Sequence, residues 1–274
     1  MFRFKEVFII LALLVETILS ANLQYEACKP KYCGDNLSIS YPFWIHGQHE
    51  SYCGLPLFQI NCTEEKPTIR VSNYDYIVHN ISYGNLTIQL VDVEALDATC
   101  PTLQHNISLH AAPFQRGPNY IDLYFFYNCT SVPSESFTYP VGCATNSSRG
   151  QHSFAVFSHQ LGLQYLNASS RNCESMVNAP VDIDEGTNYE TLAKMSYLDV
   201  LREGFHLKWP ITNNCSACEK SGGHCGFEHS NFVCFCPDQP YSRICRKGKP
   251  FQYTVLSVYS QFVFNSISHR FHLF

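Results

Sequence analysis

Apolar and polar residues alternate in short runs through the early part of the chain. The runs LSISYPFWI, LPLFQINC and TIRVSNYDYIVHNISYGNLTIQLVDV are rich in Ile, Val, Tyr and Thr, which are typical of strands. Short turn sequences, Asn-Tyr-Asp and Tyr-Gly-Asn, interrupt these runs at intervals of about ten residues. The pattern predicts an all-β region over residues 28–100, arranged as a sandwich or a barrel-like meander.

The second half of the chain mixes strand patterns with one helical pattern. NYIDLYFFYNC, which ends at Cys129, and the segment Phe154–Phe157 are further strand candidates. A helix is predicted to begin at Thr187, with Glu190 completing a capping box, and to end at Gly204 as a C-terminal cap. The apolar residues of this helix recur at helical spacing and are expected to pack into the core: Leu192, Met195, Leu198 and Leu201.

The two ends of the chain carry different signals. Arg3 and Lys5 precede nine apolar residues, Val7 to Val15, and the small residues Ser20 and Ala21 follow. This layout predicts a secretory signal peptide over residues 1–21, since about 20 apolar residues are needed to span a bilayer as a helix. Residues 246–274 are predicted to be a tail outside any domain, because the apolar part of this tail is broken by Gln, Ser and Tyr and does not form a membrane span.

Composition supports export. The chain has 14 cysteines, an even number that suits a disulfide framework in an oxidising compartment. Charged residues make up only 15% of the chain, and a net charge of −5 gives no general attraction for nucleic acid. Nine Asn-x-Ser/Thr sequons are predicted glycosylation sites: Asn36, Asn61, Asn80, Asn85, Asn106, Asn128, Asn146, Asn167 and Asn214. Three of them, at Asn61, Asn128 and Asn214, have cysteine in the middle position and are expected to be modified poorly.

The densest cysteine stretch, CSACEKSGGHCGFEHSNFVCFC, admits two interpretations. Cys215, Cys218, His224 and His229 have a spacing that could supply four zinc ligands. The export signals favour disulfides instead, and neither a metal nor a cofactor is expected. The last six cysteines, spaced C-x2-C-x6-C-x8-C-x-C-x8-C, resemble an EGF-like module. Six cysteines allow 15 pairings, and this resemblance implies one of them: Cys215–Cys225, Cys218–Cys234 and Cys236–Cys245.

Longer stretches carry a more specific resemblance. ISYPFW, YCGLPLFQINC and YIVHNISYGNLTIQLVD resemble the galacturonan-binding domain of plant wall-associated receptor kinases. REGFHLKWPITNNCSACEKSGGHCGFEHSNFVCFC resembles the C-terminal domain that follows it in leaf-rust-resistance-like receptor kinases. The resemblance spans residues 28–245. It implies a galacturonan-binding domain at residues 28–100 and a cysteine-rich C-terminal domain at residues 120–245.

The expected fold is therefore mainly β and disulfide-rich, with two small extracellular domains, the second of which has one helix and an EGF-like cysteine block. The expected location is secreted, at the outer face of the plasma membrane and the cell wall.

Catalytic function is not expected. The sequence has no glycine-rich phosphate loop, no His-Arg-Asp catalytic loop and no Asp-Phe-Gly, so it lacks the kinase motifs that follow such ectodomains. Asp182, Asp184 and Glu185 could supply paired carboxylates for glycoside hydrolysis, but PVDIDEGTN is more typical of a solvated loop.

Two binding functions remain open. The resemblance implies a pectic polysaccharide ligand, which needs aromatic faces for sugar rings and cations for carboxylates. The alternative is a cysteine-rich module that binds a peptide or a co-receptor. Candidate ligand-binding residues are Tyr41, Phe43, Trp44, Lys29, Lys31 and Arg70. Further candidates are Tyr52, Trp209, Arg116 and the group Arg246, Lys247 and Lys249. The default interpretation is core packing for the aromatic rings and a solvated face for the cations.

Overall fold

The structure, a computed structural model, describes residues 23–246 with several gaps. Residues 35–36, 97–99, 101–102, 110–111, 118, 133–137, 146–148, 159–170, 184–190, 192–193 and 211–214 are not described. The predicted signal peptide and nearly all of the predicted tail therefore lie outside the described residues.

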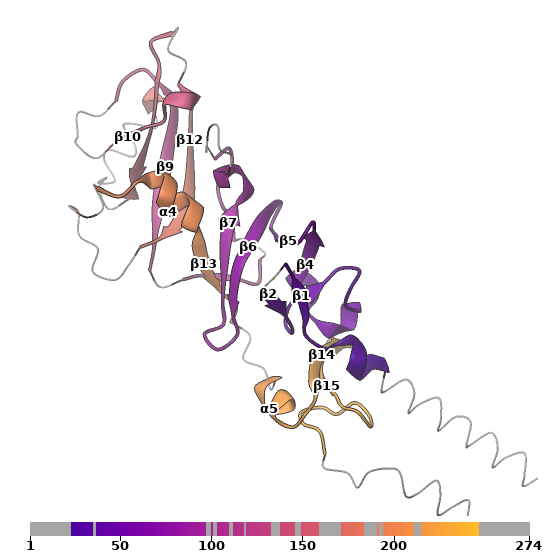
Figure 1. Cartoon of the computed structure of the whole chain (residues 1–274). Coiled ribbons are helices and arrows are strands. Elements are labelled where there is room, and N and C mark those ends of the chain that lie inside the picture. Colours follow the sequence, from indigo (N-terminus) through magenta and orange to yellow (C-terminus); the bar gives the residue numbers. More distant parts are fainter. Residues whose placement is uncertain are drawn as a thin grey trace, which may run out of the picture.

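A seven-stranded sheet forms the middle of the molecule (Figure 1). Its strands run in the order β3-β4-β5-β6-β7-β13-β8. They are β3 (Trp44–Ile45), β4 (Gln59–Thr63), β5 (Lys66–Val71), β6 (Tyr74–Ser82), β7 (Thr87–Asp92), β13 (Phe205–Lys208) and β8 (Gln115–Arg116). Strands β4 to β7 form an antiparallel meander whose alternating pattern buries one face. The strands expected over residues 28–100 are thus present.

Strand β13 joins distant parts of the chain. It pairs with β7 in register Phe205↔Leu90 to Lys208↔Thr87, and β8 pairs with its other edge. The sheet therefore extends across the boundary that the sequence placed between residues 100 and 120. Gly204 makes this junction possible, because its φ is +78° and an added Cβ would lie 2.0 Å from the carbonyl oxygen of Leu90.

A second, four-stranded sheet lies at one end of the molecule (Figure 1). Its order is β10-β11-β9-β12, formed by β9 (Tyr120–Cys129), β10 (Tyr139–Pro140), β11 (His152–Phe157) and β12 (Ser175–Asp182). Apolar residues from both sheets belong to one continuous core, which includes Ile88 and Leu207 from the first sheet and Phe125 and Val181 from the second. The mainly β fold class is confirmed.

The predicted helix over residues 187–204 is not continuous. The chain leaves helical conformation at Met195 and Ser196, and α4 (Tyr197–Glu203) begins after Ser196, whose backbone is extended. Gly204 ends the helix, as expected. The break lets Tyr197, Val200 and Leu201 turn into the core, while the expected start at Thr187 lies outside the described residues.

The cysteine-rich block lies at the opposite end from the four-stranded sheet, beside the beginning of the described chain (Figure 1). It contains α5 (Cys215–Lys220) and the hairpin of β14 (His224–Glu228) and β15 (Asn231–Phe235). Phe235 packs with the Cys28–Cys53 disulfide, and Gln24 donates a hydrogen bond to Glu228 at 3.1 Å. The small hairpin of β1 (Lys31–Cys33) and β2 (Leu37–Ile39) lies nearby.

All 14 cysteines form disulfides. The block holds Cys215–Cys225, Cys218–Cys234 and Cys236–Cys245, the same three pairs that the EGF-like resemblance implies. The other four pairs are Cys28–Cys53, Cys33–Cys62, Cys100–Cys143 and Cys129–Cys173.

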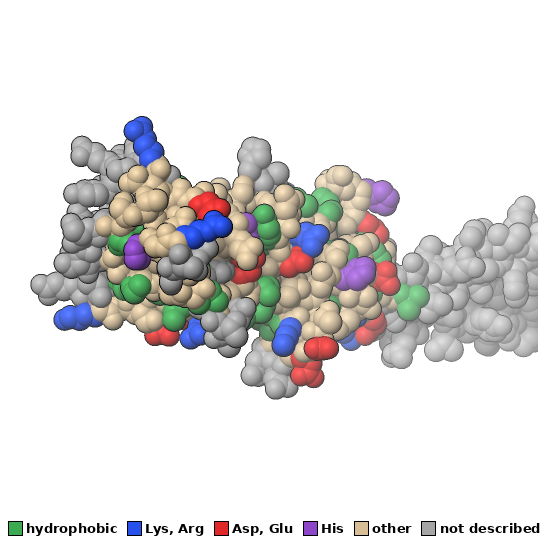
Figure 2. All heavy atoms as spheres, turned by 90° about the horizontal axis from the view of Figure 1, so that it is seen from above, with side chains coloured by type: hydrophobic (Ala, Val, Ile, Leu, Met, Phe, Trp, Pro, Cys, Tyr) green, Lys and Arg blue, Asp and Glu red, His purple; other side chains and the backbone are tan. Residues whose placement is uncertain are grey.

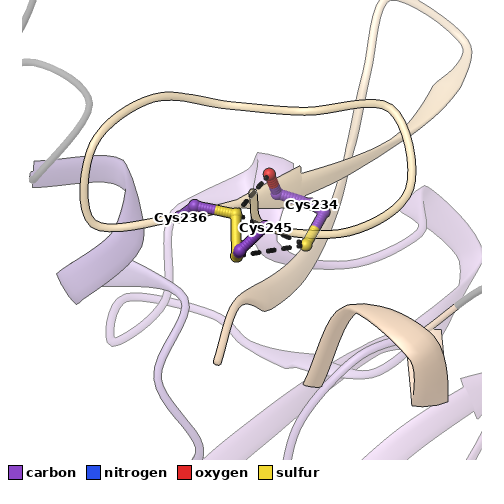
Figure 3. Close-up of side chains that lie close together, drawn as sticks. All are labelled: Cys234, Cys236 and Cys245. Atoms are coloured by element: carbon purple, nitrogen blue, oxygen red, sulfur yellow. Dashed lines mark hydrogen bonds between the residues drawn. A yellow bond between two sulfur atoms is a disulfide. The ribbon is translucent and has the colours of Figure 1, made fainter. Parts of the chain in front are cut away.

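Sulfur atoms converge at the centre of the block (Figure 3). The Sγ atom of Cys234 lies 3.7 Å from that of Cys236 and 3.8 Å from that of Cys245. Gly223 passes so close that a Cβ there would lie 2.5 Å from the Cys234 sulfur. A metal would need thiolates, whereas Cys236 is bonded to Cys245 and Cys234 is bonded to Cys218, so this cluster of sulfur atoms consists of two disulfides.

Short 3-10 helices connect several strands: η1 (Ser51–Cys53), η2 (Pro56–Phe58), η3 (Val93–Leu96) and η4 (Gly142–Ala144). Among the described residues, no helix has the length and apolar character needed to cross a membrane.

Candidate functional site

A groove of about 790 Å³ opens beside the hairpin formed by β5 and β6. Strand β4 and the η2 turn supply one wall, the hairpin supplies another, and a segment after β7 completes the groove. It is lined by Pro56, Leu57, Gln59, Asn61, Arg70, Ser72, Asn73, Tyr74, Ser108, Ala112 and Pro113. Its size falls within the range of small-ligand sites, and its lining combines amides, hydroxyls, one cation and one aromatic ring.

Strand alternation places the polar side chains of the groove. Ile60 of β4 and Ile69 of β5 are buried, so Gln59 and Asn61 on β4 and Arg70 on β5 face outward. The amide of Gln59 donates a hydrogen bond to the side-chain oxygen of Asn61 at 3.2 Å. Adjacent strands thus present amide and guanidinium donors on one surface.

Arg70 is held by the residue opposite it on the neighbouring strand. Its Nε and Nη2 atoms donate to the two carboxylate oxygens of Asp75 at 2.8 and 2.9 Å. This hydrogen-bonded partner lowers the pKa of Asp75 and raises the pKa of Arg70, so both groups are charged at neutral pH. The pair leaves Nη1 of Arg70 for a further acceptor, since no described residue bonds to that atom.

Tyr74 supplies the aromatic wall. Its side chain is 43% exposed, and its ring stacks on His105 with ring centroids 3.4 Å apart and an interplanar angle of 8°. The imidazole therefore supports one face of the phenol ring. An aromatic ring held in this way is the kind of surface on which the apolar face of a sugar ring packs.

His105 lies close to three polar groups, of which Asp92 and Tyr76 are buried. Its Nε2 atom lies 3.2 Å from a carboxylate oxygen of Asp92 and 3.2 Å from the hydroxyl of Tyr76, and Nδ1 lies 3.7 Å from Glu94. Burial raises the pKa values of Asp92 and Tyr76. His105 thus lies between the ring of Tyr74 and the buried side chains of Tyr76 and Asp92.

The aromatic residues chosen from the sequence lie elsewhere. Tyr41, Phe43 and Trp44 are buried and do not line the groove, which agrees with core packing, the default interpretation of these rings. Phe43 packs edge-on against Trp209 at 5.0 Å, and the indole of Trp44 donates to the carbonyl of Leu55 at 2.9 Å. Half-buried Tyr52 packs against Phe235 in the cysteine-rich block.

The cations are scattered and mostly paired. Lys29 is paired with Glu26, and Lys31 donates to the backbone carbonyl of Gln48, both outside the groove. Arg116 lies 3.6 Å from Asp122, and Arg246 lies over the ring of Tyr241. Figure 2 likewise shows Lys and Arg dispersed among acidic residues on one face. Lys247 and Lys249 lie outside the described residues. Of the six ligand-binding candidates, Arg70 is the one that lines the groove.

Five predicted glycosylation sites lie on described residues. Asn61, Asn80, Asn85 and Asn106 are exposed. Asn128 differs, because its φ is +52° and its Nδ2 atom donates to Glu174 at 2.8 Å. The other four sequons, at Asn36, Asn146, Asn167 and Asn214, lie outside the described residues.

Asp182 is not in a solvated loop. It is the last residue of β12, and its Oδ2 atom accepts hydrogen bonds from the backbone N–H of His206 at 2.7 Å and from the His206 ring at 2.5 Å. Asp184 and Glu185 lie outside the described residues.

Sequence reasoning missed Tyr74 and Leu57 as groove residues. Tyr74 lies in the run Asn-Tyr-Asp, which was interpreted as a turn, whereas the turn consists of Ser72 and Asn73 and Tyr74 begins β6. The positive φ of Ser72 marks that turn. Leu57, an apolar residue just before the short strand β4, is not marked as a binding residue by any sequence pattern.

Two family models match parts of this chain. Residues 28–92 match the family model described as wall-associated receptor kinase galacturonan-binding, and residues 142–239 match the one described as wall-associated receptor kinase C-terminal. The first match contains the groove residues from β4 to β6. Neither matched region is a kinase domain.

Two curated relatives come from Arabidopsis thaliana. The chain is 36% identical over 250 residues to leaf rust 10 disease-resistance locus receptor-like protein kinase-like 1.2, covering 90% of this chain and 38% of the relative. It is 30% identical over 243 residues to the corresponding kinase-like 2.1, covering 84% of this chain and 37% of the relative. The chain therefore spans less than two-fifths of the length of either relative. No solved structure matches the chain.

Proposed function

We propose, from the premise that this chain carries a wall-associated-kinase-like ectodomain, that it binds pectic polysaccharide in the groove between β4 and the β5–β6 hairpin. The observation that carries the proposal is the coincidence of this groove with the segment that matches the galacturonan-binding family model. The ectodomain character of both matches implies a location outside the cell, facing the wall.

The chemistry of the groove suits a sugar acid polymer. Tyr74 offers a supported aromatic face, Gln59 and Asn61 offer amides for hydroxyl groups, and Arg70 offers N–H donors to a carboxylate. One cation that already has an acidic partner gives only modest attraction per contact. We therefore expect weak binding of a single site to a short oligosaccharide. Retention on a long polymer should be stronger, because a protein released from one segment can rebind a neighbouring segment.

Asn61 sets a condition on this function. It lines the groove and belongs to a sequon, Asn61-Cys62-Thr63, so a glycan on it would fill the site. Cys62 is bonded to Cys33, which constrains the sequon backbone. We expect that Asn61 is unmodified in the binding form.

The test is retention of the secreted protein on immobilised de-esterified galacturonan, on fully methyl-esterified pectin and on a neutral glucan. Tyr74→Ala is expected to reduce retention on the first matrix several-fold. Tyr32→Ala is the matched control, because Tyr32 is 63% exposed and does not line the groove. Equal retention on all three matrices, or equal effects of the two tyrosine variants, would favour a protein or peptide ligand.

If this chain functions as its relatives' names suggest, its ligand binding serves a receptor-like kinase. That role would place polysaccharide recognition upstream of a signal. We propose no catalytic step for the residues of this chain.

A further inference from the structure

A second groove, of about 610 Å³, lies where the two sheets meet. Strands β7 and β13 form its floor, and the end of β12 together with α4 forms its wall. Its polar lining includes Asn85, Thr87, Gln89, Asn119, His206 and Lys208. None of these residues lines the groove at Tyr74 and Arg70.

The floor is an ordered array of side chains. Thr87 pairs with Lys208 and Gln89 pairs with His206 across the antiparallel strands. Because Ile88 and Leu207 between them are buried, these four side chains face outward together. Asp182 holds the His206 ring, and Gln89 donates to the backbone carbonyl of Glu203 at 2.9 Å. The array is therefore fixed before any ligand arrives.

The charge of the groove suits a neutral ligand. Two carboxylates, Asp182 and Glu203, lie along the same surface as one ammonium group, that of Lys208. The groove therefore offers a polyanion such as galacturonan no excess of Lys or Arg over carboxylates. Amides, a hydroxyl and the half-buried side chain of Met195 match the alternating hydroxyl groups and apolar faces of an uncharged oligosaccharide.

The rim of the groove carries an attachment point for such an oligosaccharide. Asn85 is exposed, lines the groove, and is the acceptor of the sequon Asn85-Leu86-Thr87, whose threonine belongs to the floor. Asn85 lies in the turn that precedes β7, and Gln89 is the third residue of that strand, so a glycan on Asn85 starts at one end of the groove floor.

We propose that the N-linked glycan of Asn85 lies in this groove and acts as a built-in part of the fold at the junction of the two sheets. In the modification, the amide nitrogen of Asn85 bonds to the first sugar carbon of a lipid-diphosphate-linked oligosaccharide. The sugar–phosphate bond breaks, and the lipid diphosphate leaves as the amide gives up one proton. The glycan then extends over Thr87 and Gln89 toward His206 and Asp182.

A glycan packed in a groove is shielded from enzymes, which gives a direct test. The full chain is secreted from cells that leave every glycan in the oligomannose form, and endoglycosidase H release is followed at each site by mass spectrometry. Release at Asn85 is expected to be at least tenfold slower in the native than in the denatured protein. Asn106, which is exposed and outside the groove, is expected to show nearly equal rates.

A variant separates packing in the groove from other causes of slow release. Asn119→Tyr adds bulk to the groove wall without changing the sequon, and it is expected to raise native release at Asn85 to the Asn106 rate. An unoccupied Asn85, or equal native and denatured rates in the unmodified sequence, would overturn the proposal. The test on the unmodified sequence stands even if the variant is not secreted, and it does not depend on pectin binding.

Discussion

Removing the negative charge of Asp75 is expected to strengthen binding to de-esterified galacturonan, although Asp75 itself does not line the groove. Asp75 occupies Nε and Nη2 of Arg70 through bonds of 2.8 and 2.9 Å, so it competes with a galacturonate carboxylate for the same guanidinium. Asp75→Asn removes this competition while keeping the side-chain shape. Arg70→Gln removes the cation and should weaken binding.

The size of both effects follows from exposure. The Arg70 side chain is 65% exposed and that of Asp75 is 45% exposed, so their interaction is screened by water and salt. Exposed pairs of this kind change an equilibrium by about two- to fivefold. We therefore expect the affinity for a short oligogalacturonide to rise about two- to fivefold in Asp75→Asn and to fall by a similar factor in Arg70→Gln.

Isothermal titration at low and physiological ionic strength measures these affinities, with a neutral oligosaccharide as the control ligand. Both differences should shrink as salt increases, because screening acts on exposed charges. Equal affinities of the two variants, or a gain in Asp75→Asn that does not depend on salt, would refute the competition between the two carboxylates.

Three further predictions concern the fold. Gly204→Ala should lower the free energy of unfolding by about 1–3 kcal/mol in denaturant titration, because φ of Gly204 is +78° and the new Cβ would lie 2.0 Å from the Leu90 carbonyl oxygen. Gly84→Ala is the control and should have little effect, because there is open space around Gly84. Cys234→Ala should cost about 2–5 kcal/mol and reduce the secreted yield, and a normal yield would show that the Cys218–Cys234 bond is dispensable. Burial lowers the pKa of His49, whose Nδ1 accepts a hydrogen bond from the Ile45 N–H. Neutral His49 therefore stabilises the fold fully above its unfolded pKa of about 6.5, and this stabilisation is lost as the pH falls through its lower folded pKa. The melting temperature should drop between pH 7 and 5 more in the wild-type chain than in His49→Gln.

Local patterns predicted the strands that pair with their neighbours in sequence. Strands β4 to β7 follow from alternation and turn residues, since each hairpin is closed by a short local turn. Strand β13 was missed because Phe205–Lys208 is only four residues long and its partner, β7, lies more than 100 residues earlier. No local rule specifies a pairing of that kind.

The helix shows the opposite failure. The apolar residues keep helical spacing along the sequence, although the backbone leaves helical conformation at Met195 and Ser196. These apolar residues are Leu192, Met195, Leu198 and Leu201. Tertiary packing of Tyr197 and Val200 in the core decided the start of α4 instead of the capping box.

The candidate site was the least predictable part. Aromatic residues chosen by type, Phe43 and Trp44, are core residues, because sequence alone does not distinguish a buried ring from an exposed one. Arg70 was identified because cations are few. The contribution of Tyr74 depends on stacking against His105, which approaches from a segment about 30 residues later.

Hydrogen–deuterium exchange with and without an oligogalacturonide tests the central claim most directly, because it reports where the ligand lies. The groove between β4 and the β5–β6 hairpin predicts slower exchange in segments 56–61 and 70–74, with no change in the cysteine-rich block at residues 215–236. A neutral glucan oligosaccharide should leave both regions unchanged. Protection confined to the cysteine-rich block, or no protection by the oligogalacturonide at saturating concentration, would contradict the account.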